Sequence, residues 1–191
     1  NELNTPAFVR NPPDRCYYCK RNLLTLVREA ADEHGLAHVL EGTNADDAAD
    51  HRPGLRAARE MKARQPLREA GLTKADIRDL SRKLGLPGWD KPAQPCLASR
   101  VPYGDAVTGE ALEMIEAGEA YLHALGLRQC RVRHHDTVAR IELPPEDIAR
   151  FHDEKVRAAL VAKFKEIGYN YVTLDMEGYR SGSMNESLGS P

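Results

Sequence analysis

The chain has 191 residues, 41% of them hydrophobic, and its 27 Lys and Arg against 29 Asp and Glu give a formal net charge of -2. That balance argues against a nucleic-acid-binding surface, and no apolar run approaches the roughly 18 residues that a membrane-spanning helix needs. Four cysteines are too few for a disulfide scaffold, so we expect a reducing, cytoplasmic setting.

The first third predicts a long helix, a short strand and a loop. Helical spacing predicts a helix over residues 15–34 whose inward face carries Leu23, Val27, Ala30 and Ala31. AHVLEG, residues 37–42, reads as a buried strand. The polar segment TNADDAADHRPGL would then be a loop at the carboxyl end of that strand, where open α/β sheets bind ligands. A short helix over 55–61 follows.

The clearest helical signal is QPLREAGLTKADIRDLSRKLGLP. Thr73 suits the N-cap with Asp76 at the third position, which is nearly a capping box. Gly85 ends the helix and Pro87 prevents it from resuming. The proline-rich loop GWDKPAQPCLASRVPYG comes next and marks the domain boundary, so we expect domains over 1–104 and 105–191.

The second half predicts a small α+β unit. A helix over 108–125 precedes two alternating segments, QCRVRHH and VARIEL, joined by the hairpin signal HDT. One helix over 145–167 and a third strand in NYVTLDM complete it.

Two cysteines three positions apart open the first long helix, in RCYYCK. Cys16 and Cys19 then share one helix face, and the partial positive charge of a helix N-terminus favours thiolates. The spacing alone leaves three readings open, namely a redox dithiol, half of a metal site and a packing pair.

Cys96, on the proline-rich loop, is a natural third thiol. Three thiolates with no clear fourth ligand suit a 4Fe–4S cluster that leaves one iron open. Structural zinc would require a fourth Cys or His. The fourth cysteine, Cys130, lies in an alternating strand and is expected in the core.

An anion site is the last candidate. Arg131 and Arg133 share one strand face, and Arg180 lies beside a Gly/Ser turn. Guanidinium groups bind phosphate or carboxylate in a bidentate manner, although a solvated strand face explains the strand pair equally well. Glu119, on the preceding helix, could simply be solvated.

Taken together, EGTNADD, RPGLRAARE, QPLREAGLTKADIRDLSRKLGLP, WDKPAQPCLASRVPYG and YRSGSMNE resemble the LarE family through nearly the whole chain. Members of this family are ATP-dependent sulfur transferases that help build the nickel-pincer nucleotide cofactor of lactate racemase. The pattern around LGLP is shared more widely by ATP-pyrophosphatases. The resemblance implies an α/β fold, the PP-loop parallel sheet of adenine-nucleotide alpha-hydrolases, followed by a small α+β domain for substrate binding and oligomerisation.

The resemblance also implies a reaction. ATP, with Mg2+, adenylates a carboxylate of a pyridinium dicarboxylate mononucleotide, and sulfur displaces AMP to give a thiocarboxylate. One version of the family sacrifices a cysteine sulfur. The other holds a 4Fe–4S cluster on three cysteines, which Cys16, Cys19 and Cys96 match. The family forms trimers and hexamers.

Other roles are implied by position in the family. Arg131, Arg133 and Arg180 correspond to the substrate phosphate cluster and Glu119 to the acidic residue near it. The stretch Gly42, Thr43 and Asn44 corresponds to the nucleotide-side loop.

One departure from the family is the absence of the SGGxDS loop that holds ATP phosphates, which we interpret as truncation before Asn1. Two alternatives remain open at this point. A tRNA thiolase of the same superfamily would need a basic surface, which a net charge of -2 does not offer. A non-catalytic, metal-stabilised fragment would lack the ATP loop altogether.

Overall fold

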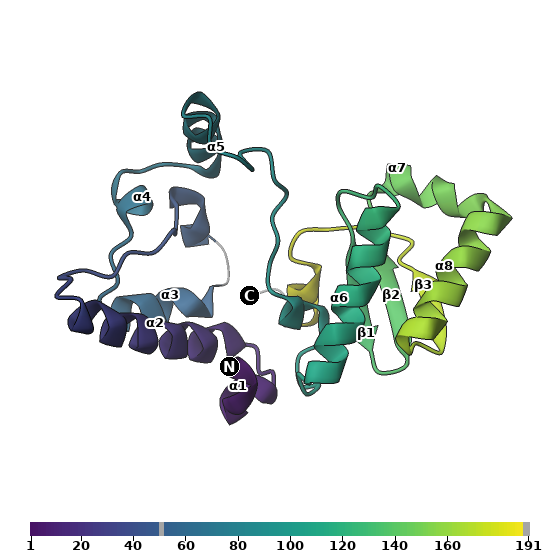
Figure 1. The fold of residues 1–191 in the computed structure, drawn as a ribbon, viewed down its shortest axis with the longest axis horizontal. Coiled ribbons are helices and arrows are strands. Elements are labelled where there is room, and N and C mark those ends of the chain that lie inside the picture. The colour runs from purple at the N-terminus through teal and green to yellow at the C-terminus, as the bar shows by residue number, and fades with distance from the viewer. Residues whose placement is uncertain (50–51, 189–191) are drawn as a thin grey trace. The chain divides into compact units, whose positions relative to one another are not determined.

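The computed structural model describes residues 1–49 and 52–188, and it divides into two compact units (Figure 1). The N-terminal unit comprises residues 1–8 and 12–91, and the C-terminal unit comprises residues 9–11 and 92–191. Residues 9–11 belong to the second unit because Val9 and Asn11 accept hydrogen bonds from the backbone of Val107 and Gly104, at 2.9 and 3.0 Å. Asp50 and His51 of the predicted polar loop lie outside the described residues.

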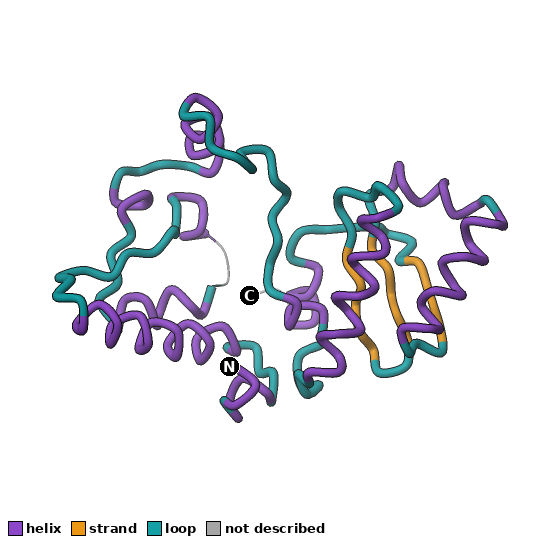
Figure 2. The backbone as a smooth tube through the Cα atoms, in the orientation of Figure 1, coloured by secondary structure: helices purple, strands orange, loops and turns teal. Residues whose placement is uncertain are grey.

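The N-terminal unit is helical, as the tube in Figure 2 shows. Its central feature is α2 (Arg15–Glu33), which lies against α3 (Pro53–Glu60). Leu24 and Ala31 of α2 form a small core with Val39 and Ala58. The other elements are η1 (Glu2–Asn4), α1 (Pro6–Val9), η2 (Ala45–Ala49), α4 (Pro66–Glu69) and α5 (Lys74–Lys83).

Two predictions for this unit need correction. The strand expected over 37–42 is a single parallel bridge between Leu40 and Arg64. The inward face expected for the first helix is wrong in part, because Leu23 and Val27 are 47% and 39% exposed while Leu24 is 4% exposed. Helical spacing identifies an apolar stripe, and here α3 packs against only one flank of it.

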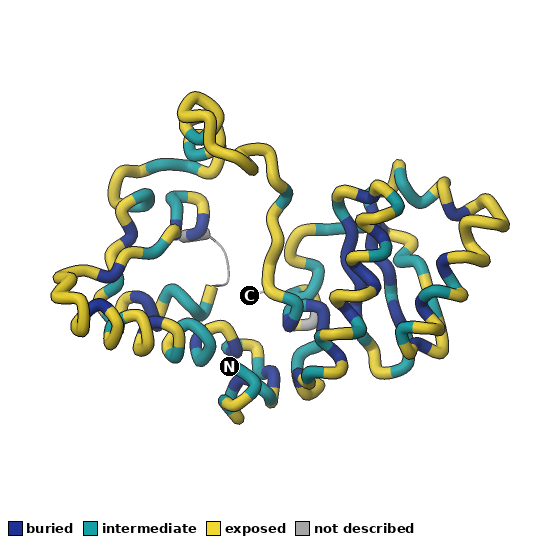
Figure 3. The backbone as a smooth tube through the Cα atoms, in the orientation of Figure 1, coloured by how far each residue is buried: buried dark blue, intermediate teal, exposed yellow. Residues whose placement is uncertain are grey.

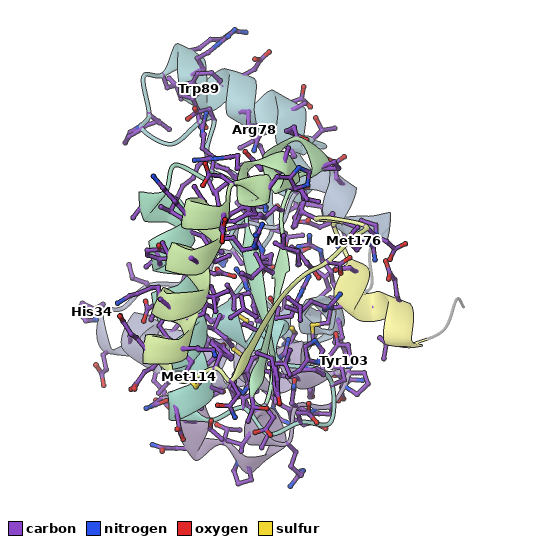
Figure 4. All side chains as sticks on the ribbon, turned by 90° about the vertical axis from the view of Figure 1, so that its right-hand side faces the viewer. His34, Arg78, Trp89, Tyr103, Met114 and Met176 are labelled. Carbon is purple, nitrogen blue, oxygen red and sulfur yellow. The ribbon has the colours of Figure 1, made fainter. Side chains whose placement is uncertain are left out.

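The helix α5 confirms its predicted start. Thr73 accepts a hydrogen bond from the Asp76 amide at 3.2 Å, and the Asp76 carboxylate accepts one from the Thr73 amide at 2.9 Å. This capping box satisfies two of the amides that a helix start leaves without partners. No residue of α5 is buried, and the segment is exposed along most of its length (Figure 3). The loop after it carries Trp89, labelled with Arg78 in Figure 4.

The C-terminal unit is a mixed three-stranded sheet with helices. The strands are β1 (Arg131–His135), β2 (Val138–Glu142) and β3 (Tyr171–Leu174), in the order β1-β2-β3. β1 and β2 form the predicted antiparallel hairpin, and β3 adds in parallel to β2. The helical elements are η3 (Leu97–Arg100), α6 (Gly109–Ala124), α7 (Pro145–Ile148), η4 (Ala149–His152), α8 (Glu154–Ile167) and η5 (Ser183–Leu188).

The single helix predicted over 145–167 is broken at Asp153. This residue has extended backbone angles, and its carboxylate accepts hydrogen bonds from the amides of Lys155 and Val156. An aspartate that caps the helix after it ends the helical path before it.

The sheet has an apolar face and a charged face. Helices α6 and α8 cover the first, where Leu122, Val132, Ile141 and Phe164 belong to one buried core. The approach of α6 is close, since a Cβ on Gly118 would lie 3.2 Å from the Phe164 ring. Because strand side chains alternate, Arg131 and Arg133 point to the opposite face.

The molecule is therefore an α/β chain with a small mixed sheet. The PP-loop parallel sheet stays a prediction. Among the described residues, no helix is both long and apolar enough to cross a membrane.

Candidate functional site

Cys16 and Cys19 lie in the first two turns of α2, on one face of the helix. Cys16 is exposed and Cys19 is half-buried. Between them, Tyr17 points to α3, where its hydroxyl donates to Glu60 at 2.7 Å and Arg56 stacks 3.8 Å above its ring. The buried tyrosine fixes the rotation of the helix, which leaves Cys16 toward solvent.

The predicted nucleotide-side stretch, Gly42 to Asn44, is a structured turn in the same unit. The Thr43 hydroxyl donates to Glu41 at 2.6 Å, and the Asn44 amide donates to Asp47 at 3.0 Å. These local bonds give a loop outside regular structure a defined conformation.

Cys96 belongs to the C-terminal unit and directly precedes η3. Its carbonyl accepts hydrogen bonds from the amide of Ser99 at 3.0 Å and from the guanidinium of Arg100 at 3.2 Å, while its side chain is exposed. The thiol opens on a cavity of about 390 Å³. Among the residues that line this cavity, which we call the Cys96 pocket, are Cys96, Arg100, Glu116, Glu119, His123 and Arg131.

Glu119 holds one wall of the Cys96 pocket in place. Its two carboxylate oxygens accept from Arg100, each at 2.8 Å, and both side chains are buried. One of the same oxygens accepts from the Val132 amide at 3.0 Å. This amide lies on the outer edge of β1, so Glu119 satisfies a buried group that a neighbouring strand would otherwise pair.

Arg131 is a buried cation without a carboxylate partner in the described part of the chain. The residue is 4% exposed. It donates to the carbonyls of Cys130 and Ala93, both at 2.6 Å, and lies 5.3 Å from the Tyr179 ring. Burial, and then the neighbouring Arg100, lower its pKa. An anion bound in the Cys96 pocket would offset both the cost of burying this charge and its repulsion by Arg100.

Arg133 is neutralised, although it shares a sheet face with Arg131. It forms a two-bond ion pair with Glu142 at 2.8 and 2.7 Å, and Glu142 is fully buried. Arg133 also donates to the Ser99 carbonyl and to the Ser183 hydroxyl, each at 2.8 Å. It lines a second, smaller cavity of about 130 Å³ together with Arg140.

Arg180 pairs with two glutamates on the protein surface. It lies 3.1 Å from the carboxylates of both Glu177 and Glu186. The three arginines expected to form one phosphate cluster therefore have three different surroundings.

Cys130 is fully buried in the core of the C-terminal unit, as its strand position predicted. Burial first, and the negative charge of Glu119 second, raise the pKa of its thiol to about 12. A neutral, enclosed thiol is a packing residue and a poor nucleophile.

The predicted site residues are thus divided. Cys96, Glu119 and Arg131 meet at the Cys96 pocket, whereas Cys16, Cys19 and the stretch Gly42 to Asn44 belong to the N-terminal unit. Within residues 1–49 and 52–188, no group of three or more His, Cys, Asp or Glu side chains is placed to hold a metal ion.

Sequence reasoning missed Arg100, Glu142 and Arg140. A signal for two of them existed, because the predicted hairpin turn pairs Arg133 with Arg140 and Arg131 with Glu142. Like charges directly opposite one another in a sheet are destabilising, so such a register requires nearby carboxylates. Arg100 has no comparable signal, since its partner Glu119 is distant in sequence.

Three proteins are similar in sequence to this chain along almost its whole length. It is 47% identical over 188 residues to an uncharacterized protein of Synechocystis, a match that covers 98% of this chain and 70% of that protein. It is 41% identical to the pyridinium-3,5-bisthiocarboxylic acid mononucleotide synthase of Lactiplantibacillus plantarum, over 97% of this chain and 67% of that enzyme. It is 31% identical to an uncharacterized protein of Methanocaldococcus jannaschii, over 94% of this chain and 69% of that protein. No family model matches the chain.

Proposed function

Because this chain belongs to the LarE family, which includes the Lactiplantibacillus plantarum synthase, we propose that it is an ATP-dependent sulfur transferase. Its substrate is a pyridinium dicarboxylate mononucleotide. ATP adenylates one carboxylate, which gives a poor electrophile a good leaving group, and sulfur then displaces AMP to leave a thiocarboxylate. The observation that supports this proposal best is the Cys96 pocket, where an exposed thiol and the unneutralised Arg131 share one cavity.

Arg131 is the group that binds the substrate anion. A guanidinium that already donates to two carbonyls is held in one orientation, so little conformational freedom is lost when an anion binds. The Gln129 side-chain oxygen, in the orientation that satisfies its amide, accepts from the same two terminal nitrogens at 3.1 and 3.3 Å, so the acceptor that the guanidinium still lacks is an anionic one, a phosphate or carboxylate. Arg133 would have to exchange its carboxylate partner for the substrate, and Arg180 already pairs with Glu177 and Glu186 although its Nη1 has no hydrogen-bond partner among the described residues, so we assign both to supporting roles.

In this proposal Glu119 is a positioning residue for η3 and takes no part in the reaction. Its carboxylate is occupied by Arg100 and by the Val132 amide, and it fixes η3 relative to β1. The carbonyl of Cys96 is bound by the same Arg100. The hydrogen bonds that run from Glu119 through Arg100 to the Cys96 carbonyl therefore fix the position of Cys96 at the cavity.

The sulfur source in this proposal is a 4Fe–4S cluster held by Cys16, Cys19 and Cys96. Three thiols are the ligand number of such a cluster when one iron stays open, and the proposal draws Cys16, which is exposed, and Cys19, which is half-buried, from the start of α2 and the exposed Cys96 from the loop of the C-terminal unit. When bound, the cluster supplies a sulfide that can be transferred without consuming a protein cysteine. The thiols require a reducing compartment, which agrees with a cytoplasmic location.

The nucleotide side is assigned to Gly42, Thr43 and Asn44. These residues follow the bridge at Leu40, and the turn there is already ordered by Asp47. ATP would be bound with Mg2+, which keeps several waters and contacts the phosphates directly. A trimer or hexamer is part of the proposal, and light scattering of the full-length protein tests it.

The test is an anaerobic assay of the full-length protein with ATP and the pyridinium dicarboxylate mononucleotide. Mass spectrometry should show ATP-dependent replacement of a carboxylate oxygen by sulfur. Cys96→Ala should abolish the product, whereas Cys130→Ala, a change in the core, should retain it. A product that forms equally without ATP would contradict the proposal.

The cluster is tested separately. Reconstitution with iron and sulfide should give a cluster absorbance that Cys16→Ala abolishes. Full activity in iron-free protein, with one cysteine converted to dehydroalanine, would reject the cluster and leave the sulfur transferase in place.

A further inference from the structure

Glu41 is a buried carboxylate at which three segments of the N-terminal unit meet. Its side chain is only 6% exposed. It pairs with the ammonium of Lys20, accepts from the Thr43 hydroxyl at 2.6 Å and accepts from the Gln65 side chain at 2.5 Å. None of these residues is among the candidate ligands for sulfur chemistry, and only Thr43 belongs to the nucleotide-side loop.

The three partners come from different elements. Lys20 directly follows Cys19 on α2, Thr43 lies in the stretch Gly42 to Asn44, and Gln65 precedes α4. One carboxylate therefore connects the cysteine helix to the nucleotide-side loop.

The junction is stiff for two reasons. The backbone of Glu41 is fixed, because its amide donates to the Arg64 carbonyl at 2.9 Å and the Arg64 amide donates to the Val39 carbonyl at 2.9 Å. The side chain is held as an anion. Burial alone would raise the pKa of Glu41, but the hydrogen bonds from Lys20 and Thr43 outweigh it and lower the pKa. A buried charge with several donors has few alternative arrangements.

A second tether at the cysteine end of α2 leads to a different element. Tyr17 ties the cysteine helix to Glu60 and Arg56, which belong to α3. They would hold the helix in place whatever the loop does. A shift of Thr43, in contrast, would move the Glu41 carboxylate, because this carboxylate binds both Thr43 and Lys20.

We propose that Glu41 is a positioning residue that couples the nucleotide-side loop to the Cys16–Cys19 helix, so that nucleotide binding changes the placement of the two thiols. The inference rests on the proposed function, which assigns nucleotide to this loop. It adds a path between the two half-reactions through Lys20 and Glu41. By linkage, a change at the thiols alters nucleotide affinity by the same factor.

The test measures alkylation of Cys16 and Cys19 in cluster-free, full-length protein, mapped by mass spectrometry, with and without a non-hydrolysable ATP analogue. The variants are Glu41→Gln, which keeps the side-chain shape, and Lys20→Met, which removes only the ammonium. Glu69→Gln is the matched control, since Glu69 accepts from Arg64 and from the Gln65 amide but contacts no residue of α2 among its described bonds. Calorimetry with the same analogue measures binding, and thermal melting confirms that each variant is folded.

In wild type and Glu69→Gln, the analogue should change the alkylation rate of the half-buried Cys19 by about fivefold, the low end of measured coupling between sites. In Glu41→Gln and Lys20→Met the effect should largely disappear. Variants that keep the wild-type dependence overturn the inference, and so does an analogue that binds wild type without changing alkylation. If one variant fails to fold, the other decides.

Failure of the proposed function looks different. An analogue that does not bind wild type contradicts nucleotide use, and the positioning role is then judged without nucleotide. In that case Glu41→Gln must still speed the alkylation of Cys19 relative to Glu69→Gln. Equal rates would overturn the role of Glu41.

Discussion

Arg131 and Arg133 lie two residues apart on the same face of β1, and the two ends of that face differ in charge balance. At the Arg133 end, Glu142 and Asp175 neutralise Arg133 and Arg140. Beside Arg131, the Glu119 carboxylate pairs with Arg100, and the Glu142 carboxylate, which lies opposite Arg131 in the strand register, pairs with Arg133, so Arg131 has no carboxylate partner among the described residues. The comparison teaches that residue type and strand position do not determine a role. Arg133, which pairs with a carboxylate, stabilises the fold. Arg131, which has no such partner among the described residues, is the one that we propose binds an anionic ligand.

The largest expected effect on stability comes from removing the carboxylate that pairs with Arg133. Glu142→Gln leaves Arg133 buried without its ionic partner, which should lower the free energy of unfolding by about 3–5 kcal/mol. Urea denaturation measures it. A loss below about 1 kcal/mol, the range of exposed ion pairs, would mean that Arg133 depends on a carboxylate partner no more than Arg131 does.

A second effect should appear at the wall of the Cys96 pocket. Glu119→Gln keeps an acceptor for the Val132 amide but leaves Arg100, which is 3% exposed, without its ionic partner, so we expect a loss of about 3–5 kcal/mol here as well. Glu116→Gln is the matched control, since Glu116 is an exposed residue of the same helix and pocket and should change stability by less than about 0.5 kcal/mol. Equal effects of the two changes would contradict the positioning role.

The cysteines offer a pH test of the same contrast between buried and open groups. With its pKa raised to about 12, Cys130 stays a neutral thiol throughout the range in which the protein can be handled. Alkylation at pH 7 and at pH 9 should therefore modify the exposed Cys96 and leave Cys130 unmodified at both. Modification of Cys130 in the folded protein at pH 9 would show that the core around this residue, which directly precedes β1, opens.

The smallest effect is expected at Arg180. Its partners Glu177 and Glu186 are exposed to solvent, and ion pairs with exposed groups contribute little to stability. Arg180→Gln should leave both the melting temperature and substrate binding close to wild type. A large loss of binding would return Arg180 to the phosphate cluster that the sequence predicted.

The sequence predicted the C-terminal unit better than the N-terminal one because its signals are local. Alternation and the HDT turn are enough to predict the β1–β2 hairpin. The expected strand over 37–42 depends on a parallel partner, and the structure provides only the bridge to Arg64. Whether a segment pairs with a parallel strand distant in sequence cannot be predicted from the residues of that segment alone.

The site was predictable in its residue types but not in its pairings. Cys96 was singled out by its chemistry and Arg131 by the family resemblance, and the structure places both at one pocket. Glu119 resembles any solvated helix glutamate in sequence, and its role depends on the edge of β1 lying beside α6. The difference between Arg131 and Arg133 could be found only by locating each carboxylate.

The central claim is that Arg131 receives the substrate anion, and calorimetric titration of the pyridinium dicarboxylate mononucleotide tests it most directly. The account predicts that Arg131→Gln weakens binding by about tenfold to a hundredfold, the loss expected for hydrogen bonds to a charged group. Arg133→Gln, measured where it remains folded, should bind nearly as well as wild type. Undiminished binding by Arg131→Gln, with a loss in Arg133→Gln, would contradict the account.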